Sequence, residues 1–415
     1  MLMYDLNEEK ERVILVAVCT DDIKDTEISL DELAELAKTA GAEVVGRVIQ
    51  NREGIHPGYY VGTGKTEEIK ELAEETNADS ILCDDELSPA QMKNLEADLN
   101  LRVLDRTLII LEIFAMRARS AEGKLQVELA QQKYRLSHLV GMHKELSRLG
   151  GGIGTRGPGE KKLEVDRRAI NSRISRLKEE IDEVKKNREV TRSKRSASVI
   201  PMVAIVGYTN AGKSTLLNRL TDAGVLEENA LFATLDPTTR SYVMKNHREV
   251  LFTDTVGFIN KLPHHLVDAF KSTFEEAKYA DIIVHVADAS DENLDRKMAV
   301  VYDTMQKLDI CDKPIITIFN KTDLLLEEVT VKDLKADEYL RASIKFDKNL
   351  DNLEEALEKV ISKSNVSYEI VLSYADTKKL SILQKNGNVE TCDYLEDGIH
   401  VKGVAPRSIL NGLEL

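Results

Sequence analysis

The chain has 415 residues, a formal net charge of −15, 42% hydrophobic residues and 31% charged residues. This size predicts roughly two to four domains with real cores, and the composition excludes wholesale disorder and fibrous repeats. No apolar run approaches the ~20 residues that cross a bilayer, the N-terminus has no signal-peptide pattern, and the cysteines are scattered. We therefore expect a cytoplasmic protein without a membrane anchor. At face value, the acidic balance argues against a nucleic-acid partner.

The first 105 residues alternate short apolar runs with helical patterns, which predicts an α/β domain with a mainly parallel sheet. The expected strands are 12–18, 42–49, 80–83 and 101–104, and the expected helices are 30–39, 66–76 and 89–99. Ser88 and Pro89 form a helix start. Gly62–Lys65 resembles a phosphate loop, but Tyr59 stands where the first glycine is required. This favours a turn before Thr66 over a second nucleotide site.

Residues 106–195 have a different periodicity. Mostly apolar residues recur at alternating spacings of four and three, namely Leu125, Leu129, Gln132, Leu136, Leu139, His143 and Leu146, and the pattern resumes at Leu163, Ile170, Ile174, Leu177, Ile181 and Val184. This spacing is typical of a coiled-coil seam, and two such helices joined by a loop predict an antiparallel hairpin. Its tip is the glycine-rich stretch 150–160. Residues 193–198 read as a linker.

A phosphate-binding motif follows the next apolar run. The sequence Gly-x-x-x-x-Gly-Lys-Ser stands between a strand pattern and a helix pattern, which is the setting a P-loop requires. Its backbone N–H groups would cradle phosphates, Lys213 would meet the β- and γ-phosphates, and Ser214 would ligate Mg²⁺. The expected nucleotide-binding residues here are Gly207, Tyr208, Thr209, Asn210, Ala211, Gly212, Lys213, Ser214 and Thr215.

Two further motifs follow in the order that a GTPase requires. An apolar strand ends in Asp-x-x-Gly, where Asp254 would hold Mg²⁺ through water and the Gly257 N–H would sense the γ-phosphate. The residues of this motif are Asp254, Thr255, Val256 and Gly257. Asn320-Lys321-Thr-Asp323 then predicts guanine over adenine, because an unpaired buried carboxylate facing adenine costs several kcal/mol. Asn320 would contact the N7 edge, and the stem of Lys321 would lie over the ring.

The segment between the first two motifs must supply a hydroxyl that completes the Mg²⁺ coordination. Thr234 is our choice, with Thr238 and Thr239 as rivals, and we assign catalytic roles to Lys213, Thr234 and Gly257. Ser343 is the candidate for a Ser-Ala-x turn behind the base, although Ile344 stands where alanine is usual.

The position after Asp-x-x-Gly, where Ras-type GTPases have a water-orienting glutamine, is Phe258. A phenyl ring cannot orient water, so slow intrinsic hydrolysis is expected. The water must be positioned by Asn260, His264 or His265, by another domain, or by an external partner.

These motifs and several longer stretches together resemble the HflX family of ribosome-associated GTPases in the Obg-HflX superfamily (TRAFAC class). The stretches are Asp105-Arg-Thr, 113–120, 122–130, the tip 150–160, Asp166-Arg-Arg and 232–236. The resemblance implies binding to the large ribosomal subunit, splitting of stalled ribosomes in the GTP form, and Mg²⁺ on Ser214 and Thr234. It also implies a nucleotide-contacting switch formed by Phe232, Ala233, Thr234, Leu235 and Asp236.

The charge is unevenly distributed along the chain. Residues 1–105 carry 10 Lys/Arg and 25 Asp/Glu, residues 106–195 carry 22 and 12, and the remainder carries 25 and 35. A basic hairpin between acidic domains suits ribosomal RNA, which proteins read largely by shape and phosphate. We expect Arg156, Lys161 and Lys162 to contact RNA. The competing interpretation is a solvated coiled-coil face with a flexible turn.

The predicted fold is α/β. It comprises an N-terminal α/β domain (1–105), a coiled-coil hairpin (106–195), a P-loop GTPase domain with a doubly wound, mainly parallel sheet (199–365), and a small α+β appendage (366–415). The predicted function is an Mg²⁺-dependent GTPase, monomeric when free, that binds the large subunit and splits stalled or idle ribosomes. The alternative is a GTP-gated ribosome assembly or anti-association factor whose function is binding.

Overall fold

The computed structural model describes residues 10–149, 158–196, 200–221, 231–233, 235–261, 263, 276–310, 312–325, 331–363, 365–406, 410 and 413. The chain packs as two compact units. The first unit comprises residues 1–182, 229–235 and 260–270, and the second comprises 183–228, 236–259 and 271–415. The four domain boundaries expected from the sequence stay predictions.

The first unit contains a four-stranded sheet in the order β2-β1-β3-β4, with every pairing parallel. The strands are β1 (Arg12–Cys19), β2 (Glu43–Asn51), β3 (Ser80–Cys83) and β4 (Arg102–Asp105), and the helices are α1 (Ile23–Thr39), α2 (Thr63–Thr76), α3 (Pro89–Leu99) and α4 (Arg106–Arg117). Seven of the eight residues of β1 are buried. The mainly parallel sheet predicted from the apolar runs is therefore confirmed.

Helix caps explain where the helices of this unit begin. The Ser88 side chain accepts from the backbone N–H of Gln91, whose own side chain accepts from Ser88, so α3 begins with the reciprocal capping box. Helix α1 begins at Ile23, well before the predicted start at Leu30, because the Asp22 carboxylate caps it.

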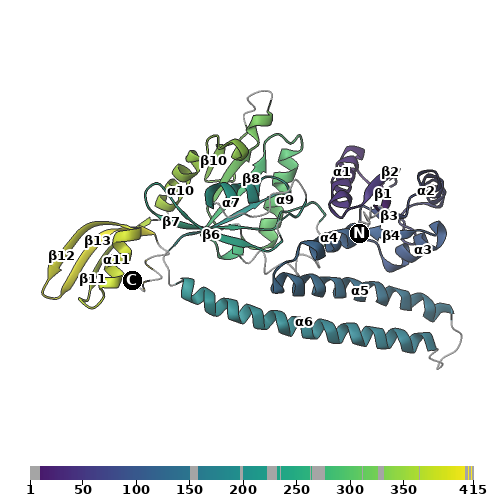
Figure 1. Ribbon diagram of the computed structural model, residues 1–415, viewed down its shortest axis with the longest axis horizontal. Coiled ribbons are helices and arrows are strands. Elements are labelled where there is room, and N and C mark those ends of the chain that lie inside the picture. The colour runs from purple at the N-terminus through teal and green to yellow at the C-terminus, as the bar shows by residue number, and fades with distance from the viewer. Residues whose placement is uncertain are drawn as a thin grey trace, which may run out of the picture. The chain divides into compact units, whose positions relative to one another are not determined.

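Two long helices, α5 (Ala121–Leu149) and α6 (Pro158–Ser196), run side by side in opposite directions (Figure 1). Leu129 on α5 packs with Ile174, Leu177 and Ile181 on α6, all at predicted seam positions. The Arg173 guanidinium also donates two 2.7 Å hydrogen bonds to the carboxylate of Glu128 across the pair. Residues 150–157 of the expected tip lie outside the described residues.

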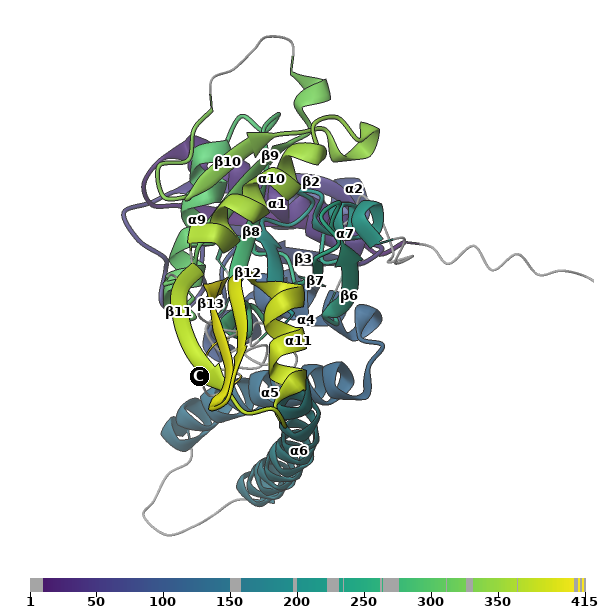
Figure 2. The same cartoon turned by 90° about the vertical axis from the view of Figure 1, so that its left-hand side faces the viewer.

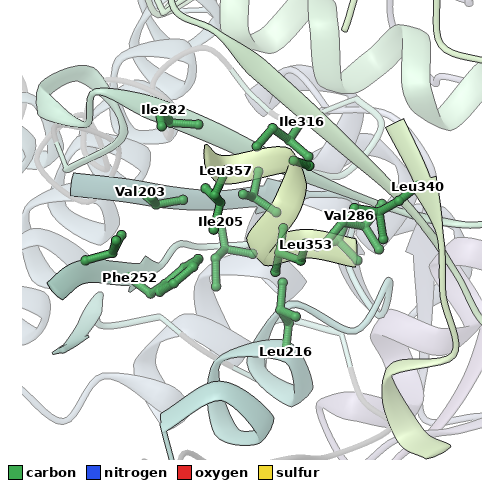
Figure 3. Packing of buried hydrophobic residues seen from close by; sticks show 14 of the residues in the cluster. Val203, Ile205, Leu216, Phe252, Ile282, Val286, Ile316, Leu340, Leu353 and Leu357 are labelled. Carbon is green, nitrogen blue, oxygen red and sulfur yellow. The ribbon is translucent and has the colours of Figure 1, made fainter. Parts of the chain in front are cut away.

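The second unit contains a six-stranded sheet in the order β10-β9-β8-β5-β7-β6, parallel except for the β6–β7 pair. Its strands are β5 (Met202–Gly207), β6 (Thr238–Val243), β7 (Glu249–Asp254), β8 (Ile282–Asp288), β9 (Ile315–Asn320) and β10 (Glu338–Arg341). Its helices are α7 (Lys213–Thr221), α9 (Leu294–Lys307) and α10 (Asp351–Lys363). Figure 3 shows the core between this sheet and the apolar residues of α7 and α10.

The C-terminal part is a three-stranded antiparallel sheet in the order β11-β13-β12, with α11 packed beside it (Figure 2). The elements are β11 (Asn365–Leu372), α11 (Thr377–Asn386), β12 (Asn388–Leu395) and β13 (Gly398–Pro406). This agrees with the α+β appendage expected from the turn signals. Across the described part of the chain, every helix is too short or too polar to span a bilayer.

Candidate nucleotide site

The predicted P-loop connects the end of β5 to the start of α7. At two of its positions, only glycine fits the backbone and the space available. Gly207 has φ +153°, and a Cβ there would lie 2.2 Å from the carbonyl oxygen of Val286 on β8. Gly212 has φ +104°, and its Cβ would lie 2.3 Å from Nδ2 of Asn320. The loop can therefore curl tightly against its neighbours only with glycine at both positions.

Lys213 begins α7 and is buried, and its Nζ donates a 2.7 Å hydrogen bond to the carbonyl oxygen of Tyr208. Burial lowers the pKa of this ammonium to about 8, although the carboxylate of Asp254 opposes the shift. A Cβ on Gly257 would lie 2.9 Å from the Lys213 Nζ. The Asp-x-x-Gly motif thus reaches the lysine that is expected to meet the phosphates.

The two predicted Mg²⁺-binding side chains that the structure describes, Ser214 and Asp254, lie in contact. The Ser214 hydroxyl donates a 2.7 Å hydrogen bond to Oδ2 of Asp254, which is fully buried at the end of β7. A hydroxyl and a carboxylate are the hard oxygen donors that Mg²⁺ takes when phosphates and water supply its other ligands. The residues present therefore fit the metal. Thr234, the third predicted ligand, lies outside the described residues.

Phe258 is held against the P-loop by its backbone. Its N–H donates to the carbonyl oxygen of Gly207 at 3.0 Å, and its carbonyl oxygen accepts from the N–H of Thr209 at 2.9 Å. The side chain is 1% exposed. That Phe258 does not orient water stays a prediction. Of the alternatives on the following loop, Asn260 is described and His264 and His265 are not.

Asn320, at the end of β9, joins the P-loop to the loop that follows β10. Its Nδ2 donates to the carbonyl oxygen of Ala211 at 2.8 Å, and its Oδ1 accepts from the N–H of Ile344 at 3.0 Å. The amide is 4% exposed. Both contacts of Asn320 in this structure are therefore with the protein backbone. The second hydrogen on its Nδ2 is the one that remains for a contact with a base.

Asp323 and Ser343, separated by twenty residues, are directly hydrogen-bonded. The Ser343 hydroxyl donates to Oδ1 of Asp323 at 2.5 Å, and Ser343 itself is fully buried. The ammonium of Lys321 lies 2.6 Å from Oδ2 of Asp288. The structure therefore brings together the predicted base-recognition residues, including Ser343, whose sequence context is unusual.

The remaining predicted site residues are divided between the two units. Thr255 and Val256 are buried directly after the end of β7. Phe232, Ala233 and Leu235 belong to the first unit and Asp236 to the second. Of the rivals to Thr234, Thr239 shares a 2.9 Å hydrogen bond with Thr253 on the β6–β7 pair, and Thr238 begins β6. Arg156 lies outside the described residues, as do the side chains of Lys161 and Lys162.

Sequence reasoning missed the surroundings of the P-loop on the α9 side. A cavity of about 60 Å³ there is lined by residues that include Tyr208, His285, Asp288 and Lys297. The Lys297 ammonium lies 5.2 Å from the centre of the Tyr208 ring. Tyr208 belongs to the P-loop motif, but no motif marked His285, Asp288 or Lys297, because the common location of these residues results from the strand order. In the Gly62–Lys65 stretch, Gly62 is the N-cap of α2 and Thr63 begins the helix, so these residues form the first turn of α2 and not the turn before Thr66 that the sequence predicted.

Comparisons with known proteins extend this result to the whole chain. Three family models match: GTP-binding GTPase N-terminal over residues 27–115, GTP-binding GTPase Middle Region over 117–195, and 50S ribosome-binding GTPase over 202–321. The GTPase HflX of Lacrimispora saccharolytica is 56% identical and covers 99% of this chain and 97% of that protein. GTPase HflX of Caldanaerobacter subterraneus is 50% identical and covers 96% and 92%.

Among solved structures, a GTP-binding protein from Sulfolobus solfataricus in complex with GDP is 26% identical. The match covers 84% of this chain and 98% of that chain, with a TM-score of 0.44. The full-length matches to the curated relatives show that the chain belongs to the HflX family of P-loop GTPases and hydrolyses GTP.

Proposed function

We propose that this GTPase binds the large ribosomal subunit in the cytoplasm and, in its GTP form, splits stalled or idle ribosomes. Hydrolysis to GDP then resets it, and the free protein is a monomer. The observation that carries the proposal is a nucleotide site and a long, basic two-helix hairpin in one chain. The family model for residues 202–321, described as a 50S ribosome-binding GTPase, supports the choice of partner.

In this proposal each nucleotide-site residue has a separate task. The backbone of the loop from Gly207 to Thr215 holds the phosphates, and the Lys213 ammonium neutralises the β- and γ-oxygens. The Gly257 N–H, adjacent to Lys213, senses the γ-phosphate. Asp323 accepts from the two guanine donors, N1–H and the exocyclic amine, and Ser343 holds its carboxylate in position.

Mg²⁺ would be held by Ser214 and Thr234 directly and by Asp254 through water. The bound metal supplies a charge that stabilises the developing negative charge on the phosphates. The contact between Ser214 and the buried Asp254 holds both oxygens in place before nucleotide arrives.

The hairpin supplies the RNA contact. Helix α6 has exposed basic side chains on its described part, namely Arg167, Arg168, Arg176, Lys178 and Lys186. Their charge is carried on a rigid element, since the seam between the helices is buried and the Glu128–Arg173 pair crosses it. Phosphate neutralisation by such side chains releases counterions and makes binding salt-dependent.

Sedimentation with large subunits, in a GTP-analogue state and in a GDP state, tests the proposal. We expect the wild type to co-sediment in the GTP-analogue state, and expect both a deletion of residues 150–159 and an Arg167→Glu/Arg176→Glu variant to bind weakly. A Lys70→Glu/Lys93→Glu variant makes the same charge change on exposed residues of α2 and α3 and is expected to bind normally. Equal loss of binding in this control, or GTPase activity that large subunits do not stimulate, would contradict the proposal.

The second candidate function is a GTP-gated assembly or anti-association factor, in which binding is the function and hydrolysis only resets the protein. Phe258 favours it, because this residue is buried and hydrogen-bonded to the P-loop through its backbone, which suits slow hydrolysis. Incubation of intact ribosomes with the protein and a non-hydrolysable GTP analogue separates the two. Splitting under these conditions supports the first function. Complete failure to split, together with retained binding to free large subunits, favours the second.

A further inference from the structure

Two short segments from the GTPase half of the sequence fold with the first unit. They are residues 229–235, which contain the predicted switch except for Asp236, and residues 260–270, which follow Asp-x-x-Gly. The first contains the predicted Mg²⁺ ligand Thr234, and the second begins three residues after Gly257, which is expected to sense the γ-phosphate. Their contacts inside the first unit therefore bear on the hydrolysis reaction itself.

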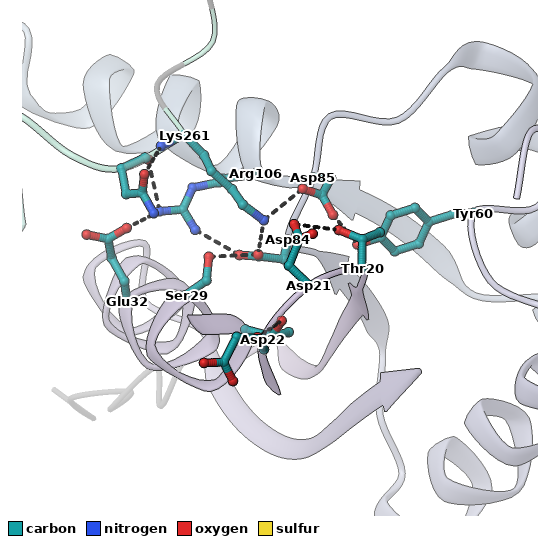
Figure 4. A network of polar contacts seen from close by, with 12 residues as sticks. Thr20, Asp21, Asp22, Ser29, Glu32, Tyr60, Asp84, Asp85, Arg106 and Lys261 are labelled. Atoms are coloured by element: carbon teal, nitrogen blue, oxygen red, sulfur yellow. Dashed lines mark hydrogen bonds and ion pairs between the residues drawn. The ribbon is translucent and has the colours of Figure 1, made fainter. Parts of the chain in front are cut away.

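Lys261 is held by two carboxylates at the end of β3 (Figure 4). Its Nζ lies 2.5 Å from Oδ2 of Asp84 and 2.7 Å from Oδ1 of Asp85. Asp84 is fully buried, and Ser29 donates to it at 2.7 Å. Burial by itself would lower the pKa of Lys261, but the two carboxylates outweigh it and raise the pKa. The ammonium therefore stays charged in its contact.

Arg106, the first residue of α4, binds Asn260, the residue before Lys261. Its Nη2 donates to the backbone carbonyl oxygen of Asn260 at 3.2 Å, and its Nη1 donates to Oδ1 of Asp84 at 2.9 Å. A further ion pair joins Arg106 to Glu32. The guanidinium is 1% exposed. The buried carboxylate of Asp84 therefore contacts two cations: the ammonium of Lys261 and the guanidinium of Arg106, which also binds Asn260.

The same helix, α4, contacts the other segment. The ring of Phe114 on α4 lies edge-on to the ring of Phe232, with centroids 4.6 Å apart, and both side chains are buried. Phe232 has φ +55° and Lys261 has φ +51°, which residues other than glycine rarely adopt. Both segments thus have unusual backbone conformations at the points where the first unit holds them.

We propose that Lys261 is a positioning residue for GTP hydrolysis, and that Asp84 and Asp85 of the first unit form its receptor. Phe258, two residues before Asn260, forms backbone hydrogen bonds to the P-loop. The first unit therefore binds Asn260 and Lys261 directly after the residue that contacts the P-loop. Because Phe258 cannot orient water, the group that does so must come from this loop, another domain or a partner. A loop held at Lys261 keeps the geometry of the first of these sources. This inference rests on GTP hydrolysis alone and is independent of ribosome splitting.

Single-turnover and steady-state GTP hydrolysis by the full-length protein, without ribosomes, tests it. We expect Lys261→Ala to lower kcat about tenfold while KM and the Kd for GDP change less than twofold, and Lys261→Arg to restore most of the rate. Lys245→Ala is the matched control, because Lys245 makes an equally short ion pair, 2.5 Å from Asp351, away from the P-loop. This control is expected to hydrolyse GTP at the wild-type rate.

A double-mutant cycle assigns the effect to the receptor. Asp85→Asn is expected to lower kcat in the wild type and to have no further effect in the Lys261→Ala background. Lys261 is partly exposed, at 38% of its side chain, so Lys261→Ala is expected to fold, and an unchanged thermal transition checks this. An unchanged or raised kcat in Lys261→Ala overturns the inference, a raised value meaning that the contact holds the loop back. Additive losses in the cycle overturn the assignment to Asp85.

Discussion

Replacement of Ser343 by alanine tests the base-recognition site at its most unusual residue. The serine is fully buried, and its hydroxyl donates a 2.5 Å hydrogen bond to the carboxylate of Asp323. A hydrogen bond to a charged group contributes about 1.5–3 kcal/mol, and part of it is recovered when the freed carboxylate oxygen turns towards guanine. We therefore expect GDP affinity to fall about tenfold, which corresponds to roughly 1.4 kcal/mol.

Titration of the nucleotide-free protein with GDP and with IDP, followed by calorimetry, measures this effect. IDP lacks the exocyclic amine, so loss of the orientation of Asp323 is expected to reduce the preference for GDP over IDP. Ser343→Ala is also expected to have no effect in an Asp323→Ala background. Ser241→Ala is the matched control, since it removes a 2.6 Å serine–carboxylate bond to Glu249 on the β6–β7 pair. A GDP affinity within twofold of the wild type, or an equal loss in the Asp323→Ala background, would refute the reasoning.

Three further predictions concern the remainder of the molecule. Burial lowers the pKa of His285 to about 4, so the unfolded imidazole binds a proton at a higher pH than the folded one. The free energy of unfolding should therefore fall by about 2 kcal/mol as the pH drops from 6.5 to 5. His285→Gln should reduce this pH dependence in thermal melts. Gly212→Ala should reduce GDP affinity by more than 100-fold in the same titration, because its Cβ meets Asn320. Arg173→Ala in the half-exposed hairpin pair should cost under about 1 kcal/mol, whereas Leu177→Ala should cost about 2–4 kcal/mol in denaturant unfolding; equal costs would contradict the importance of the buried seam.

Local patterns were sufficient for the fold class and for the position of the phosphate loop. The positive φ values of Gly207 and Gly212 are ones that glycine adopts without steric cost, so the glycine spacing of the motif is compatible with its observed backbone. The coiled-coil seam was equally predictable, because the 4/3 spacing places Ile174 and Leu177 on one face of a helix. Helix starts were less predictable: α1 begins at a carboxylate cap that lies outside its apolar periodicity.

Contacts between distant residues had no such signal. The two hydrogen bonds of Asn320 join the P-loop to the turn after β10, and they exist because β5, β8 and β9 are neighbours in a parallel sheet. The local sequence likewise made Asn260 a candidate for positioning water but contained no signal for Lys261, because Asp84 and Lys261 are 177 residues apart.

The sequence by itself therefore determined that this protein is a GTPase, through a P-loop, predicted metal-binding oxygens and a predicted guanine-recognition motif in the order that a GTPase requires. Each of these depends on residue types within a few positions of one another, where backbone geometry follows from local sterics. Only the tertiary structure decided which groups brace that chemistry. The bonds of Asn320, Ser343 and Lys261 form between elements that meet only once the sheets have assembled, and the strength of such bonds depends on burial, which no local pattern encodes.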